Sequence, residues 1–193
     1  TQLAQIAGRN GAIRIVSPTI MSPSTKAVIA DFTAKYPSTT HIMYDANSLS
    51  AIRRANEESF GQAVFPSYDL TKAKVIVGID ADFLGTWVNP AFFDTQYAAT
   101  RKLSSAPNGK RDMSRHYQFE ADFSLTGANA DYRTPVKPSQ VALVVTALYN
   151  RVASKLGGKT ITAPAIEVAN LVKAATDLVA AQGQAVVICG LND

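Results

Sequence analysis

Short apolar runs alternate along this chain with segments of helical pattern, and this alternation limits the folds that it can adopt. The run AIRIVSPTI (12–20) is rich in β-branched residues, and Ser22-Pro23 then supplies an N-cap and the favoured first-turn proline of a helix. A second strand, TTHIMY (39–44), precedes a helix expected over 49–60. Strands that alternate with helices predict βαβ units with right-handed crossovers and a mostly parallel sheet.

The apolar run VIVGI (75–79) is typical of a central strand, because strands inside parallel sheets are covered on both faces. Asn89-Pro90 opens the next helix. The later expected elements are a strand over 116–123, helices over 138–156 and 166–181, and a last strand over 185–189. The fold class is therefore expected to be α/β, a doubly wound, mostly parallel sheet with helices on both faces and a Rossmann-like order.

Length and composition favour one α/β domain over residues 1–193. With 193 residues, of which 47% are hydrophobic, the chain can bury one core, and a second full domain would be cramped. The net charge of +4 comes from scattered Lys and Arg, which do not form the continuous basic stripe of a nucleic-acid groove. The polar, aperiodic stretch 103–115 is expected to be a mobile loop.

Membrane insertion, disulfides and cysteine-held metals are not expected. No apolar stretch approaches the ~20 residues that span a bilayer, and no export signal opens the chain. Cys189 is the single cysteine, so this chain alone forms no internal disulfide, cysteine zinc site or iron–sulfur cluster. Cys189 is interpreted as a small hydrophobe, and His41 and His116 as structural histidines. No catalytic or metal-binding residue is therefore assigned.

A ligand of such a sheet would bind outside the carboxyl ends of the strands, where helix N-termini present unpaired N–H groups. The loops at this edge are 17–22, 45–48, 80–86, 121–126 and 190–193. None of them contains the glycine patterns that let a backbone approach a pyrophosphate, so an ordinary NAD or ATP domain is not expected.

Asp80 and Asp82 place two carboxylates in the loop where a phosphate-binding sheet would need glycine and neutral donors. They would repel an anion, and paired carboxylates could also form a metal or acid–base site. The simpler interpretation is that both lie in a solvent-facing loop and cap a backbone turn or meet an arginine. Trp87, which follows in the same loop, could stack on a ligand or cover the edge of the sheet.

Three segments in the same order, 48–70, 73–87 and 113–138, resemble the molybdopterin oxidoreductase superfamily. Within that superfamily they are most similar to the large iron–sulfur subunit of bacterial alternative complex III, a membrane-bound quinol oxidoreductase. The resemblance covers most of the chain. It implies a Rossmann-like domain excised from a longer parent chain, of the kind that in true molybdoenzymes helps to hold a molybdopterin guanine dinucleotide.

The chain departs from the molybdoenzyme pattern at three places that hold the cofactor. The Gly-x-Asn/Asp-Pro turn is replaced by DADF (80–83), and the Asp-Pro-Arg whose acid reads guanine falls on Glu120-Ala121-Asp122. The Pro-Gly-Thr-Asp at the head of the next helix becomes PSQV (138–141). The molybdenum ligand and the N-terminal cysteine motif are absent from these 193 residues. The resemblance thus implies a domain without a cofactor, with iron–sulfur clusters elsewhere in the parent.

The expected function is that of a noncatalytic scaffold domain of a respiratory electron-transfer subunit, on the periplasmic side of the bacterial inner membrane. Its partners would be other domains of the parent and other subunits of the complex. An alternative is a domain of an active molybdoenzyme that binds the guanine dinucleotide, and a third is a free-standing domain that binds a small nucleotide. The pocket residues, vestigial or active, would be Ser17, Thr19, Asp45, Asp80, Asp82, Thr86, Trp87, Glu120, Asp122 and Asn192.

Overall fold

A computed structural model describes residues 2–9, 11–46, 48–102 and 113–191 of the chain. The chain is divided into two compact units, unit 1 (Thr1–Leu49) and unit 2 (Ser50–Asp193), where the sequence led us to expect a single domain. Each unit is described by itself. Most of the loop expected to be mobile, residues 103–112, lies outside the described residues, and Arg115 already belongs to a strand.

Unit 1 is a βαβ unit preceded by a short helix. It contains α1 (Gln2–Gly8), β1 (Ile13–Ser17), α2 (Pro23–Lys35) and β2 (Thr39–Met43). β1 and β2 pair in parallel in a two-stranded sheet of their own, so the strands that were expected to share one sheet form two. The Ser22 hydroxyl accepts a hydrogen bond from the Thr25 N–H (3.3 Å) ahead of the first-turn Pro23, which confirms the predicted N-cap.

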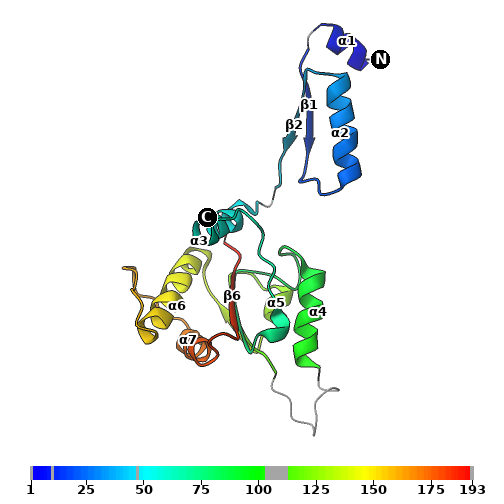
Figure 1. The fold of residues 1–193 in the computed structure, drawn as a ribbon. Coiled ribbons are helices and arrows are strands. Elements are labelled where there is room, and N and C mark those ends of the chain that lie inside the picture. Colours follow the sequence, from blue (N-terminus) through cyan, green and yellow to red (C-terminus); the bar gives the residue numbers. More distant parts are fainter. Residues whose placement is uncertain (1, 10, 47, 103–112, 192–193) are drawn as a thin grey trace. The chain divides into compact units, whose positions relative to one another are not determined.

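Unit 2 is a four-stranded, all-parallel sheet with helices on both faces (Figure 1). Its strands are β3 (Val75–Ile79), β4 (Arg115–Glu120), β5 (Tyr132–Pro135) and β6 (Ala185–Cys189). Its helices are α3 (Ser50–Phe60), α4 (Pro90–Arg101), α5 (Leu125–Asn129), α6 (Val141–Lys155) and α7 (Leu171–Ala180), with single 3₁₀ turns η1 (Leu70–Lys72) and η4 (Pro138–Gln140).

The strand order of unit 2, β5-β4-β3-β6, is that of a doubly wound, Rossmann-like sheet. The chain passes outward from β3 to β4 and β5, and then returns to place β6 on the other side of β3. The switch point in strand order therefore lies between β3 and β6. This confirms the fold class expected from the sequence.

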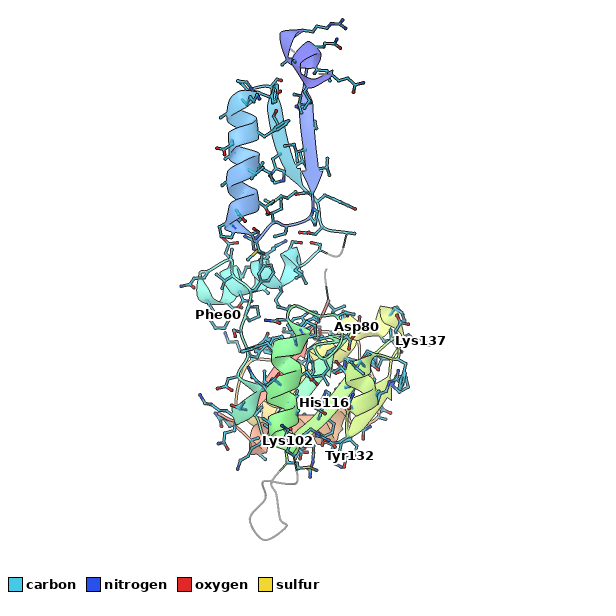
Figure 2. The ribbon with its side chains drawn as sticks, turned by 90° about the vertical axis from the view of Figure 1, so that its right-hand side faces the viewer. Phe60, Asp80, Lys102, His116, Tyr132 and Lys137 are labelled. Carbon is cyan, nitrogen blue, oxygen red and sulfur yellow. The ribbon has the colours of Figure 1, made fainter. Side chains whose placement is uncertain are left out.

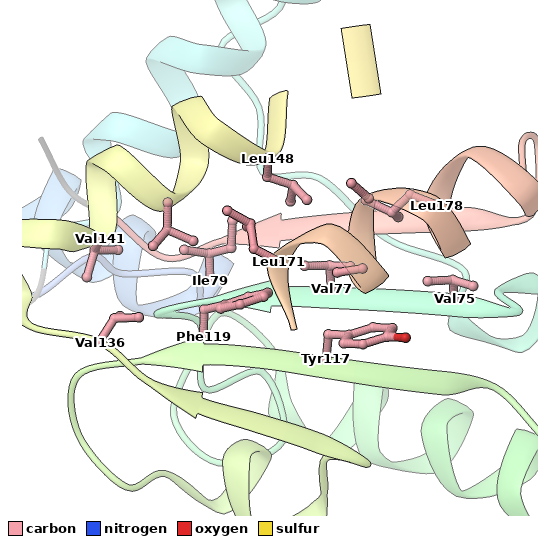
Figure 3. Close-up of a cluster of buried hydrophobic side chains, with 13 residues drawn as sticks. Val75, Val77, Ile79, Tyr117, Phe119, Val136, Val141, Leu148, Leu171 and Leu178 are labelled. Carbon is pink, nitrogen blue, oxygen red and sulfur yellow. The ribbon is translucent and has the colours of Figure 1, made fainter. Parts of the chain in front are cut away.

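The core of unit 2 lies on both faces of β3, all five residues of which are buried. Val77 and Ile79 face α6 and α7 together with Phe119, in the cluster that Figure 3 shows. Ile76 faces the opposite way, into a second cluster that contains Phe93 of α4. Burying a side chain of this size contributes roughly 1.5–3 kcal/mol, so the two clusters fix the helices on both faces of the sheet.

Several boundaries and short elements differ from the sequence expectation. The helix expected over 166–181 begins only at Leu171, because Asn170 adopts a left-handed conformation (φ 62°) that stops a helix from extending toward the N-terminus. The strand expected over 116–123 is shifted to β4, which ends at Glu120. The short elements α5 and β5 were not predicted, and β5 is an edge strand that ends in Pro135.

Candidate functional site

The carboxyl edge of the unit 2 sheet is the place where a doubly wound domain binds its ligand. Figure 2 shows Asp80 at one end of unit 2, Lys102 at the opposite end and His116 between them. At the switch point the Gly190 N–H donates to the Ile79 carbonyl (2.9 Å). A Cβ on Gly190 would lie 2.1 Å from the Asp80 carbonyl oxygen, so a larger residue would push the two loops apart. The loops after β3 and β6 are therefore in close backbone contact.

Asp82 is held by the start of α5 and by its own turn. Its carboxylate accepts hydrogen bonds from the Thr126 N–H (3.0 Å), the Thr126 hydroxyl (2.8 Å) and the Thr86 hydroxyl (3.2 Å). A Cβ on Gly85 would lie 2.1 Å from the carboxylate, so the glycine leaves room for it. Asp82 is half-buried. It is therefore only partly exposed to solvent, and its carboxylate joins the β3 loop to α5.

Glu120, at the end of β4, is buried with 2% of its surface exposed. Its carboxylate accepts hydrogen bonds from the Ser124 hydroxyl (2.5 Å), the Ser124 N–H (3.3 Å) and the Gln118 amide (3.2 Å). The Arg133 guanidinium forms an ion pair with it, with Arg133 Nε 2.5 Å from Glu120 Oε1. A Cβ on Gly127 would lie 1.9 Å from a Glu120 oxygen. The Glu120 carboxylate thus has its hydrogen-bond and ion-pair partners inside this chain.

Asp80 is exposed, and its carboxylate accepts a hydrogen bond from the Ala121 N–H at 3.3 Å. Its backbone is in the left-handed region, with φ of 50°, where a residue with a Cβ is strained. This conformation is the one that glycine adopts without cost.

We predict that Asp80→Gly raises the free energy of unfolding by up to about 1 kcal/mol, because glycine relieves the strain of the positive φ. Urea unfolding followed by circular dichroism measures the change. Asp122→Gly is the matched control, since Asp122 is also exposed but does not have a positive φ, and there glycine should destabilise by about 0.5–1 kcal/mol. Equal effects of the two variants would contradict the strain at Asp80.

The other described candidates of unit 2 are packed in the core, bonded to Asp82 or exposed. Trp87 is 8% exposed and stacks on Tyr68 with ring centroids 6.1 Å apart, so it covers the core and presents no free face to a ligand. Thr86 is exposed and bonded to Asp82. Asp122 is exposed and forms no hydrogen bond or ion pair with the rest of the described chain. Asn192 lies outside the described residues.

The candidates of unit 1 are brought together at the carboxyl ends of β1 and β2. The Thr19 N–H donates to the Asp45 carboxylate (2.8 Å), and the Thr19 hydroxyl bonds its second oxygen. These bonds lower the pKa of the Asp45 carboxyl. Ser17 Oγ lies 2.8 Å from His41 Nε2 and donates to the Pro18 carbonyl (2.8 Å). This contact joins His41 of β2 to the last residue of β1.

One face of β4 carries a buried row of polar side chains, His116, Gln118 and Glu120, which the sequence analysis did not predict to act together. Tyr97 donates to the Asn129 carbonyl (2.8 Å) and lies 3.1 Å from His116 Nδ1, while His116 Nε2 lies 3.4 Å from Gln118 Oε1. Burial lowers the pKa of His116 to about 4, so the ring is neutral. Gly78 on β3 provides space for this row, because a Cβ there would lie 1.9 Å from the Gln118 oxygen. The row ends at Glu120, whose carboxylate accepts the hydrogen bond of the Gln118 amide.

The comparisons with known proteins leave the family open. No protein-family model matches the chain, and a search of curated proteins finds no significant match. Among the residues that the structure describes, no helix is long and apolar enough to cross a membrane. The same residues contain no group of three or more His, Cys, Asp or Glu side chains that could hold a metal ion. The fold and the site define a doubly wound α/β domain in which donors at the start of α5 are bonded to Asp82, Glu120 and Ser124 of the same chain.

Proposed function

We propose that this chain is a noncatalytic, molybdopterin-oxidoreductase-like scaffold domain of a respiratory electron-transfer subunit. The observation that supports it is the use of the carboxyl edge by the chain itself. The Asp82 carboxylate accepts a hydrogen bond from the Thr126 N–H, and the Glu120 carboxylate accepts one from the Ser124 N–H. The Ser124 hydroxyl accepts one from the Gly127 N–H (2.9 Å). These are the donors that the helix after β4 would offer to an anionic ligand.

At the start of α5, an anion could bind these donors only by displacing side chains that are already bonded to them. A buried carboxylate that loses its donors costs about 1–3 kcal/mol for each hydrogen bond left unmade. The incoming anion would also meet Asp80 and Asp82 at the same edge, which repel it. Both effects oppose the binding of a guanine dinucleotide, and they support a domain that folds and packs without a cofactor.

The remaining parts of the proposal are supported by the resemblance of segments 48–70, 73–87 and 113–138 to the alternative complex III subunit. They are a longer parent chain with iron–sulfur clusters in another domain, partners among the other subunits of a membrane-bound complex, and a position on the periplasmic side of the inner membrane. In that setting the domain contributes packing surface, and electron transfer is carried out elsewhere in the parent.

We predict that the purified chain shows no calorimetric heat with GDP at about 1 mM, and that the purified parent contains less than about 0.1 molybdenum per chain by mass spectrometry. The variant Asp80→Gly with Asp82→Ala removes two negative charges and frees the Thr126 N–H. It should bring the dissociation constant for GDP down to about the millimolar range. Stoichiometric molybdenum and pterin in the parent, or tight GDP binding by the unaltered chain, would show that the pocket is active.

A further inference from the structure

Two shallow hollows, of about 300 Å³ and about 360 Å³, lie between the second half of α6 and the segment that leads into and begins α7. They share Arg151 and Val172 as lining residues, so they are adjacent, and together they are called the groove. No residue of the candidate pocket lines either of them. The first is lined by Asn150, Arg151, Ser154, Lys155, Val172 and Ala175, and the second by Arg151, Glu167, Val168, Ala169 and Val172.

The α7 side of the groove is apolar. Val172 is 56% exposed although it lies on a helix that buries Leu171 and Leu178 against the sheet. Val168 lies in the segment before α7, where it packs against the core, and Ala175 on α7 is 1% exposed, so Val172 supplies most of the apolar surface on this side. An exposed apolar side chain beside a second helix can accept side chains of another helix.

The α6 side of the groove carries a cation without a partner. Arg151 is half-buried, and it forms no hydrogen bond or ion pair with the residues that the structure describes. Every other described arginine of unit 2 has such a partner. These pairs are Arg53 with the Ala63 carbonyl, Arg54 with Glu58, Arg101 with Asp131, Arg115 with Asp177 and Arg133 with Glu120. A half-buried guanidinium is stabilised by a carboxylate that can meet its planar fork.

The other charges of the groove leave it positive at Arg151. Lys155 lines the same hollow and donates to the Thr176 hydroxyl (3.0 Å), which does not neutralise its charge. Glu167 is the one acid among the lining residues, and it is exposed and forms no ion pair with Arg151. The groove therefore combines an apolar wall with an uncompensated cation.

We propose that this groove docks an amphipathic helix of a partner protein, with apolar residues at i and i+3 or i+4 against Val172 and a carboxylate against Arg151. The groove extends over two hollows, which suits a helical segment better than a compact small molecule. A third helix laid between two packed helices places its ridge in the groove that they form. The inference is independent of whether the carboxyl edge binds a nucleotide.

The test is a selection from a displayed library of helical peptides on the purified chain, with counter-selection on the double variant Arg151→Gln, Val172→Glu. Both positions are accessible, so the variant should keep its circular dichroism spectrum and melting temperature. Recovered peptides should share an apolar i, i+3 or i+4 stripe flanked by Glu or Asp. The strongest of them is then measured by fluorescence anisotropy on the single variants.

We expect Arg151→Gln to weaken that peptide about tenfold, and replacement of the peptide's acids by amides to do the same. The control Arg54→Gln, on the exposed α3 pair with Glu58, should leave the affinity unchanged. Peptides that bind the double variant equally well, or that lack acidic residues, would overturn the proposal. So would a selection that recovers no peptide while octanoate, an apolar carboxylate, binds the groove.

Discussion

Glu120→Ala is expected to lower the free energy of unfolding by about 3–5 kcal/mol, the largest effect of any single change at the carboxyl edge. The variant leaves the Arg133 guanidinium without its carboxylate, in a site where the Glu120 side chain is only 3% exposed. It also removes the acceptor of the Ser124 hydroxyl and of the Gln118 amide. Losses of this size arise because the groups left behind stay desolvated without partners.

Urea unfolding of the purified chain measures this effect, and two variants separate its causes. Asp122→Ala, two residues away and exposed, should change the free energy of unfolding by less than about 0.5 kcal/mol. Glu120→Gln keeps the shape and one acceptor, so its effect should lie between those of the two alanine variants. If Glu120→Ala lowers the free energy of unfolding no more than Asp122→Ala does, the bonds of the Glu120 carboxylate do not stabilise the carboxyl edge. The proposal that this edge is used by the chain itself then loses its main support.

The central elements could be predicted from the sequence because their burial leaves a strong local pattern. β3 is covered on both faces, so it appears as an uninterrupted apolar run, and Pro90 marks the start of α4. α5 and β5 have five and four residues, too few to show a period. The separation of β1 and β2 from the larger sheet leaves no local signal, because their βαβ pattern is the same as that of strands that join it.

The roles of the carboxylates could not be predicted because their partners are distant in sequence. Asp82 is bonded to Thr126, which lies 44 residues further along the chain, and Glu120 is paired with Arg133 on a strand that was not foreseen. Two glycines carry a signal of these contacts, since Gly85 and Gly127 leave the space that the carboxylates fill. A single sequence does not distinguish such glycines from those of ordinary turns.

The chain should lose stability in mild acid because of His116. Burial lowers the pKa of His116 to about 4 in the folded state, whereas the ordinary value is 6.5. The unfolded chain therefore takes up a proton first as the pH falls. Stability from this group is complete above pH 6.5 and is lost progressively down to about pH 4. The whole difference corresponds to about 3 kcal/mol, of which about 2 kcal/mol should be lost between pH 7.5 and pH 5.0.

Urea unfolding at pH 7.5 and at pH 5.0 measures this loss in the chain and in His116→Gln. The glutamine variant does not titrate, so the difference between the two pH values should shrink by about 2 kcal/mol, whatever the cost of the substitution itself. His41→Gln, at the other of the two histidines, is the control for a histidine-to-glutamine change as such. Asp131, which accepts a hydrogen bond from the His116 N–H (2.8 Å), has a lowered pKa and contributes only at still lower pH. An unchanged difference in His116→Gln would mean that the buried ring is not what acid titrates.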